Sequence, residues 1–191
     1  HLERLKQPNQ QDLKVWRAID RFKGEPSSRQ WLVTGVFPRA QASLLAASGG
    51  IGKSFLLLAL ARLVAIDVTD SGQSGNARLF GGDIATHGVA MYLTAEDDAI
   101  ELHNRLHALG DIPDRLYVVP LPDAGGAQAY FAPDASTKGP TTTPAWQALV
   151  AQMEAFEDNI ALVVFDPLQP LCALDLNVPE NAQFVCSRLS A

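Results

Sequence analysis

The sequence has 191 residues, 47% of them hydrophobic and 19% charged, which is enough to bury the core of one α/β domain and excludes a chain disordered throughout. Its formal net charge of −6 excludes a broadly basic nucleic-acid-binding surface. Any contact with DNA or RNA is therefore expected to come from a local loop or from an assembled ring. No apolar run reaches the roughly 18 residues that a membrane-spanning helix needs, so no membrane association is expected.

The two cysteines, Cys172 and Cys186, lack C-x-x-C spacing and have no histidine cluster beside them. They are typical of reduced thiols rather than of a disulfide framework or a zinc site, and they favour a cytoplasmic protein. The sequence begins at His1 without a signal peptide. This beginning indicates a processed product or a fragment of a longer chain.

Hydrophobic periodicity and turn residues predict alternating helices and strands. The first elements, in chain order, are a helix at 11–22, an apolar stretch at 31–33, a buried strand at 42–46 and a helix at 55–66. A loop at 71–82, a strand at 89–94, a helix at 97–109 and a strand at 116–121 follow. The last elements are a long mobile segment at 122–144, a helix at 145–156, a strand at 160–165, an irregular stretch at 170–181 and a helix at 182–189. This alternation favours a mostly parallel sheet flanked by helices. We therefore expect an N-terminal helical extension at residues 1–30 and an α/β domain at residues 31–191.

The segment A-S-G-G-I-G-K-S at residues 47–54 matches the phosphate-binding pattern G-x-x-x-x-G-K-[ST], except that Ala47 replaces the first glycine. An apolar run precedes it and an apolar helix follows. Backbone N–H groups and the helix N-terminus suit phosphates, with Lys53 as a point charge and the Ser54 hydroxyl on Mg²⁺. The other interpretation is a glycine-rich turn without a ligand. The residues predicted to bind ATP are Ser48, Gly49, Gly50, Ile51, Gly52, Lys53, Ser54 and Phe55.

Two acidic residues follow apolar strands. Asp166 comes after I-A-L-V-V-F, which is the Walker B position for a Mg²⁺-binding carboxylate, although an aspartate before Pro167 also suits an ordinary turn. Glu96 comes after V-A-M-Y-L-T-A, where a carboxylate can accept a proton from the water that attacks the γ-phosphate. Glu96, Asp97 and Asp98 also suit the acidic start of a helix. Spacing alone does not separate these two interpretations of Glu96.

Other polar residues give weaker signals. His103 and His107 are four residues apart, as in a metal pair, but no third ligand accompanies them on this predicted amphipathic helix, which favours solvent-facing side chains. Arg105 is interpreted as an ion-pair partner, and His87 as a loop residue. Gln169 is interpreted either as a sensor of the γ-phosphate or of DNA, or as a plain loop residue.

These motifs resemble those of the RecA-like ATPases of the hexameric plasmid replicative helicases, the RepA-like helicases, and of related phage and mobile-element proteins. The resemblance covers Trp31 to the C-terminus. It rests on the phosphate loop and on W-L-V-T-G-V-F-P-R-A (31–40), M-Y-L-T-A-E-D-D (91–98), L-H-N-R-L-H-A-L-G (102–110) and V-V-F-D-P-L (163–168).

The resemblance implies a RecA-like core in which Glu96 is the catalytic base and Lys53 stabilises the reacting phosphates. It implies Mg²⁺ on Ser54 and Asp166. It further implies a ring, expected to be a hexamer, with ATP between subunits and single-stranded DNA in the central channel. The family has another strand between the phosphate-loop strand and the Asp166 strand, and the sequence ends at Ala191 before it. We therefore expect a RecA-like domain truncated at its C-terminus.

The expected function is that of an ATPase in a DNA helicase or replication protein of a plasmid, phage or integrated element. One alternative is a regulatory ATP-binding module with little or no hydrolysis. A P-loop small-molecule kinase is disfavoured, because such enzymes need a lid with several arginines and the segment 122–144 offers only Lys138.

Overall fold

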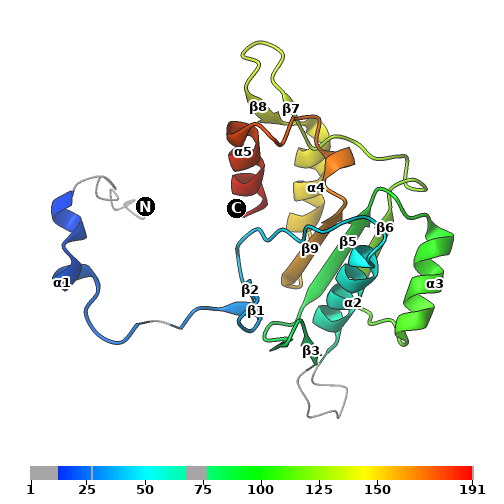
Figure 1. Cartoon of the computed structure of the whole chain (residues 1–191), viewed down its shortest axis with the longest axis horizontal. Coiled ribbons are helices and arrows are strands. Elements are labelled where there is room, and N and C mark those ends of the chain that lie inside the picture. The colour runs from blue at the N-terminus through cyan, green and yellow to red at the C-terminus, as the bar shows by residue number, and fades with distance from the viewer. Residues whose placement is uncertain (1–12, 27, 68–76, 191) are drawn as a thin grey trace. The chain divides into compact units, whose positions relative to one another are not determined.

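The computed structural model describes residues 13–26, 28–67 and 77–190, and the chain divides into two compact units, residues 1–30 and residues 31–191 (Figure 1). In the first unit the described helices are η1 (Leu13–Trp16) and α1 (Ala18–Arg21). The predicted helix at 11–22 is therefore two short pieces interrupted at Arg17, and its first two residues lie outside the described ones. Helices this short are marginal by themselves, and the side chains of Leu13, Trp16, Ile19 and Phe22 are exposed rather than buried in a core.

The second unit is built on a three-stranded parallel sheet with the order β6–β5–β9. The strands are β5 (Val89–Thr94), β6 (Leu116–Pro120) and β9 (Ile160–Asp166). In the register of the sheet Thr94 lies opposite both Pro120 and Asp166. The carboxyl ends of all three strands therefore meet at one edge of the sheet.

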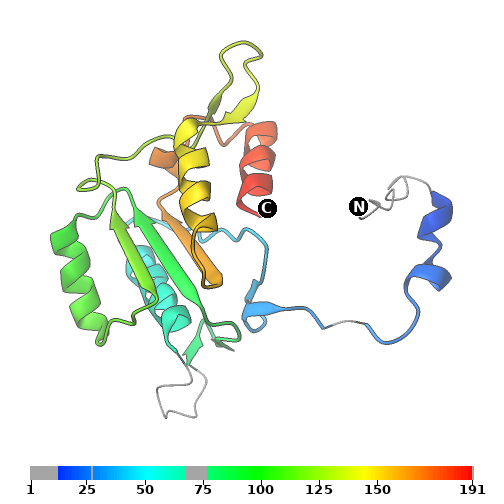
Figure 2. The same ribbon diagram turned by 180° about the vertical axis from the view of Figure 1, so that it is seen from behind.

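Helices cover both faces of this sheet. Figures 1 and 2 show α2 (Lys53–Ala65) and α3 (Ala99–Leu109) on one face and α4 (Pro144–Glu154) on the other. Side chains alternate along β5, so Ala90 and Tyr92 join the core under α2, and Met91 and Leu93 join the core under α4. The predicted α/β fold with a parallel sheet flanked by helices is confirmed.

The segment 122–144 is not the structureless excursion that its composition predicts. It contains the antiparallel hairpin of β7 (Phe131–Pro133) and β8 (Pro140–Thr142). Phe131 is fully buried, and its ring packs against Trp146 and Phe184. The glycines and prolines of the segment signal turns correctly, but they do not reveal the tertiary contacts that fix the hairpin.

The C-terminal part of the chain continues this second core. After β9 follow η2 (Gln169–Leu171) and α5 (Pro179–Leu189), which packs beside the hairpin. Helix α5 begins three residues before its predicted start at residue 182, because proline is well suited to the first helical position. Both cysteines are free thiols, with Cys172 buried and Cys186 exposed.

Two small hairpins lie near the end of the sheet at which β5 begins, away from the carboxyl ends of the strands (Figure 1). One pairs β1 (Trp31–Val33) with β2 (Phe37–Pro38), and the other pairs β3 (Arg78–Leu79) with β4 (Gly82–Asp83). The second hairpin corrects the predicted loop at 71–82, of which residues 71–76 lie outside the described part. No described helix combines the length and apolarity required to cross a membrane.

The predicted buried strand at 42–46 is wrong. These residues belong to no strand, and Leu44 is 82% exposed. Their backbone contact with the rest of the unit is a hydrogen bond from the Ala42 N–H to Ser190 Oγ, 3.0 Å long. A strand needs a neighbouring strand to satisfy its N–H and C=O groups, and among the described residues none pairs with this segment.

Candidate nucleotide-binding site

The loop at residues 47–52 leads directly into α2. Gly50 and Gly52 have φ values of 76° and 87°, in the left-handed region that glycine adopts without strain. Gly52 is the N-cap of α2, and no side chain caps the helix there. The N–H groups of the first turn are therefore left without the side-chain acceptor that usually binds one of them, and they are suited to an anion.

The ammonium group of Lys53 lies over this loop. Its Nζ donates hydrogen bonds to the carbonyl oxygens of Ala47 and Ser48, each 2.8 Å long. No ion pair links Lys53 to a carboxylate within the described part of the chain. Its charge is thus available to an anionic ligand at the cost of two hydrogen bonds to neutral acceptors.

Asp166 stands at the end of β9 and is 8% exposed. It is the only charged residue that is buried among the described ones, and no described lysine or arginine forms an ion pair with it. Its Oδ2 accepts a hydrogen bond from Tyr92 Oη at 2.5 Å. A buried carboxylate is costly unless it is paired, hydrogen-bonded or bound to a cation, so this position suits a divalent metal ion.

Tyr92 brings the two predicted metal ligands together. Its side chain is fully buried, and its Oη lies 3.4 Å from the carbonyl oxygen of Ser54, besides its bond to Asp166. Burial, followed by the hydrogen bond and the charge of Asp166, raises the pKa of Tyr92 well above its ordinary value, against a smaller opposite effect of the Ser54 side chain. The hydroxyl therefore stays protonated as a donor.

Tyr92 is not among the residues that the sequence motifs indicate. The signal that finds it is the alternation along V-A-M-Y-L-T, which places Tyr92 on the same face of β5 as Thr94, toward the helix of the phosphate loop. Periodicity alone predicts a buried aromatic residue there. Only the register between β5 and β9 reveals that its hydroxyl reaches Asp166.

A side-chain turn shapes the exit from β5. Thr94 Oγ1 accepts hydrogen bonds from the N–H groups of Glu96, at 3.3 Å, and Asp97, at 3.1 Å. Glu96 is exposed and lies two residues beyond Thr94, which is paired with Asp166 in the sheet. The candidate base and the candidate metal ligand therefore lie at the same edge of the sheet.

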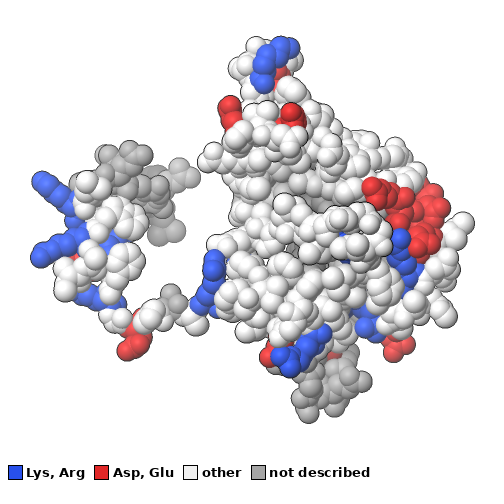
Figure 3. All heavy atoms as spheres, in the orientation of Figure 1, with Lys and Arg blue, Asp and Glu red and all other residues white. Residues whose placement is uncertain are grey.

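Asp97 also lies at this edge of the sheet, where it forms an ion pair with Arg105 and is near the Asp166 carboxylate. Arg105 donates to Asp97 at 2.6 Å and to Glu101 at 2.8 Å, so Arg105 is an ion-pair partner, as predicted. Burial raises the pKa of Asp97, and the nearby Asp166 carboxylate adds to this rise, whereas Arg105 opposes it. Acidic side chains gather around the N-terminal end of α3, as Figure 3 shows.

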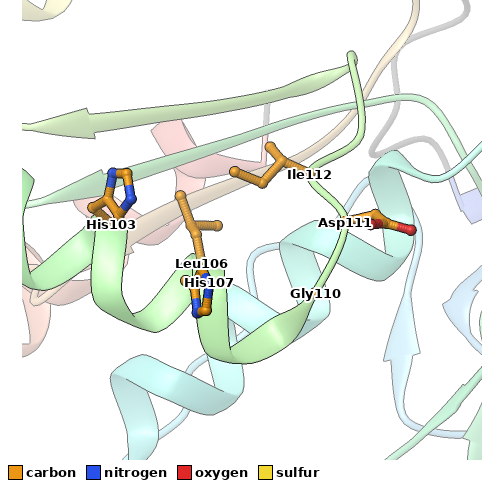
Figure 4. A pocket seen from close by; sticks show the side chains of 6 residues that line it. All are labelled: His103, Leu106, His107, Gly110, Asp111 and Ile112. Atoms are coloured by element: carbon orange, nitrogen blue, oxygen red, sulfur yellow. The ribbon is translucent and has the colours of Figure 1, made fainter.

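The weaker candidates do not join this site. His103 and His107 are exposed on successive turns of α3 and line a shallow hollow beside Ile112 (Figure 4). Within the residues that the structure describes, no group of three His, Cys, Asp or Glu side chains is placed to hold a metal ion. His87 precedes β5, at the opposite end of that strand from Thr94, and its Nδ1 is buried without a hydrogen-bond partner.

The geometry agrees with a comparison to known families. A family model described as an AAA domain matches residues 7–189, which is nearly the whole chain. The chain belongs to this AAA domain family. It is therefore a P-loop ATPase domain, and ATP is the ligand expected at the loop of residues 47–54. No curated protein matches the chain.

The residues of this AAA domain fit a magnesium nucleotide. Mg²⁺ prefers oxygen ligands and is commonly held by one or two protein groups together with substrate phosphates. Ser54 and Asp166 offer a hydroxyl and a carboxylate. The hydroxyl of Tyr92 lies 3.4 Å from the main-chain carbonyl oxygen of Ser54 and donates to the Asp166 carboxylate. The uncapped start of α2 and the Lys53 ammonium suit the phosphates.

Proposed function

We propose that the chain binds ATP with Mg²⁺ at the phosphate loop and hydrolyses it, as the motor domain of a DNA helicase or replication protein of a plasmid, phage or integrated element. The observation that carries the ATPase part is the position of the buried Asp166 carboxylate beside the phosphate loop, where the hydroxyl of Tyr92 contacts both Asp166 Oδ2 and the main-chain carbonyl oxygen of Ser54. The family match supports the ATPase part directly.

Each residue has a role in this proposal. Lys53 exchanges its bonds to the loop carbonyls for the β- and γ-phosphates, and the N–H groups of α2 bind the same phosphates. Ser54 and Asp166 hold Mg²⁺, which neutralises charge on the phosphates when bound. Glu96, exposed at the end of β5, accepts the proton of the attacking water.

The assignment to a DNA motor rests on further features. Two of the segments that resemble RepA-like helicases, 91–98 and 102–110, lie in β5, the Thr94 turn and α3, and Arg105 links the turn to the helix through Asp97. The phosphate loop is also open: a Cβ atom added at Gly49, Gly50 or Gly52 meets no atom within 4 Å. This openness leaves room for the nucleotide. A ring, proposed as a hexamer in which a neighbouring subunit completes the ATP site, rests on the resemblance. Single-stranded DNA is the proposed partner.

The test is ATP hydrolysis with and without single-stranded DNA, together with the molecular mass by light scattering. We expect hydrolysis that single-stranded DNA stimulates, in a species larger than a monomer. Glu96→Gln is expected to lower the rate at least 100-fold while ATP still binds, because general-base catalysis contributes about 10²–10⁴-fold. Glu154→Gln at the end of α4 is the matched control, because Glu154 is exposed and outside the site.

The outcomes separate the parts of the proposal. If single-stranded DNA did not change the rate of ATP hydrolysis, the helicase function would be contradicted, but the ATPase activity would not. Tight ATP binding without hydrolysis or DNA binding would instead identify a regulatory module. If Glu96→Gln retained full activity, Glu96 would not be the base.

A further inference from the structure

The hydroxyl of Tyr92 occupies an unusual position in the core. Its ring fills a fully buried site on the middle strand of the sheet, which any large apolar side chain also suits. Its Oη, however, lies 2.5 Å from Asp166 Oδ2 and 3.4 Å from the Ser54 carbonyl oxygen. The polar end of the residue is therefore in contact with both residues assigned to Mg²⁺.

A tyrosine hydroxyl has a single hydrogen and donates it to one acceptor at a time. The much shorter distance to Asp166 shows that the carboxylate is the acceptor in this structure. Hydrogen bonds to charged acceptors are roughly twice as strong as bonds between neutral groups. The bond therefore restricts the rotation of the Asp166 carboxylate and leaves Oδ1 as the oxygen with no partner from Tyr92.

We propose that Tyr92 is a positioning residue for the metal site: its hydroxyl holds Asp166 by Oδ2, so that Oδ1 is presented to Mg²⁺ or to its water, next to Ser54. This inference rests on the proposed magnesium-nucleotide site, and it does not depend on hydrolysis or on DNA. The residue acts through Asp166 and contacts no phosphate. Partners of this kind typically contribute about 10–100-fold to metal affinity or activity.

The experiment is a Mg²⁺ titration of ADP binding in the 191-residue chain, with a parallel measurement of ADP affinity in EDTA. Tyr92→Phe keeps the ring and removes the hydroxyl. We expect this variant to need about tenfold or more Mg²⁺ for half-maximal tightening of ADP binding, with its affinity in EDTA unchanged. An unchanged Mg²⁺ requirement would overturn the proposal.

The matched control is Tyr130→Phe. Tyr130 is also buried, and its ring packs against Trp146 and Phe165 in the second core, away from Ser54. It tests whether the loss of any buried tyrosine hydroxyl changes Mg²⁺ dependence. A Mg²⁺ requirement that shifts equally in both variants would show a general structural effect and would also contradict the proposal.

A double-mutant cycle separates positioning from packing. If Tyr92 acts through the carboxylate, Tyr92→Phe has little effect on Mg²⁺ dependence in an Asp166→Asn background. A full tenfold effect in that background would show that Tyr92 acts by another route. If ADP fails to bind the unaltered chain even with Mg²⁺, the proposed function itself fails, which is a different result from an unaltered titration in Tyr92→Phe.

A second measurement covers the case in which Tyr92→Phe does not fold. The chain has three tyrosines, so Tyr117→Phe together with Tyr130→Phe leaves Tyr92 alone. With fluorotyrosine incorporated, fluorine NMR then reports on this one ring. We expect its resonance to shift when Mg²⁺ is added to the ADP-bound protein, and an unmoved resonance would overturn the proposal.

Discussion

Residues 42–46 and residues 89–94 are both short apolar segments that lead to a turn at the candidate site, yet their environments are opposite. Every residue of β5, at 89–94, is buried, and the strand is hydrogen-bonded to β6 on one side and β9 on the other. The segment at 42–46 is mostly exposed and belongs to no sheet.

The difference shows that apolar composition does not make a strand by itself. A strand interior to a sheet satisfies its backbone groups through two neighbours and buries both faces under helices. In the described structure β5 has both neighbours, whereas β9 pairs only with β5. As a result, the two halves of the site differ. The strand ends that carry Thr94 and Asp166 are fixed by packing, while the bonds within the phosphate loop are those from Lys53 Nζ to the carbonyl oxygens of Ala47 and Ser48.

The largest expected effect compares the same substitution in the two segments. Leu93→Ala in β5 removes a side chain that is 3% exposed and is expected to lower the free energy of unfolding by about 2–5 kcal/mol. Leu44→Ala removes one that is 82% exposed and is expected to change it by less than about 0.5 kcal/mol. Urea unfolding followed by circular dichroism measures both. Similar losses in the two variants would show that residues 42–46 are packed in solution.

The next largest effect is expected on the affinity for ATP, with no change in the stability of the protein. Lys53→Ala is expected to weaken ATP binding about 10- to 100-fold, since a hydrogen bond to a charged group contributes about 1.5–3 kcal/mol. Its stability is expected to be unchanged, because Nζ bonds only to carbonyls of its own loop. Calorimetric titration with ATP measures the affinity. Lys138→Ala, at the turn between β7 and β8, is the control, and equal losses in both would point to nonspecific charge attraction.

The smallest effect compares the starts of two helices. Asp98 caps α3 by accepting a hydrogen bond from the Glu101 N–H at 2.8 Å, whereas no side chain caps α2. Asp98→Ala is therefore expected to cost about 1 kcal/mol of unfolding free energy. Asp114→Ala, between α3 and β6, removes the same charge without removing a cap. Thermal unfolding of both variants measures the difference, and equal shifts would assign the effect to charge alone.

Much of the fold was predictable because local signals coincide with tertiary contacts. The limits of β5 agree with prediction. Helix α3 begins at Ala99, two residues after its predicted start at 97, and Gly110 ends it, as predicted. The hairpin within residues 122–144 was not predictable, because it depends on contacts of Phe131 with residues far along the chain. The site residues Lys53, Ser54, Glu96 and Asp166 were all proposed from sequence, and their individual roles stay predictions.

The sequence by itself determined the parallel α/β architecture and the phosphate loop, because turn glycines, helix caps and apolar periodicity act over a few residues. Only the tertiary structure decided that the segment before the loop lies outside the sheet and that Tyr92 contacts Asp166 and Ser54. Strand pairing and side-chain hydrogen bonds join residues that are distant in sequence. Their partners are therefore set by packing, which no local pattern encodes.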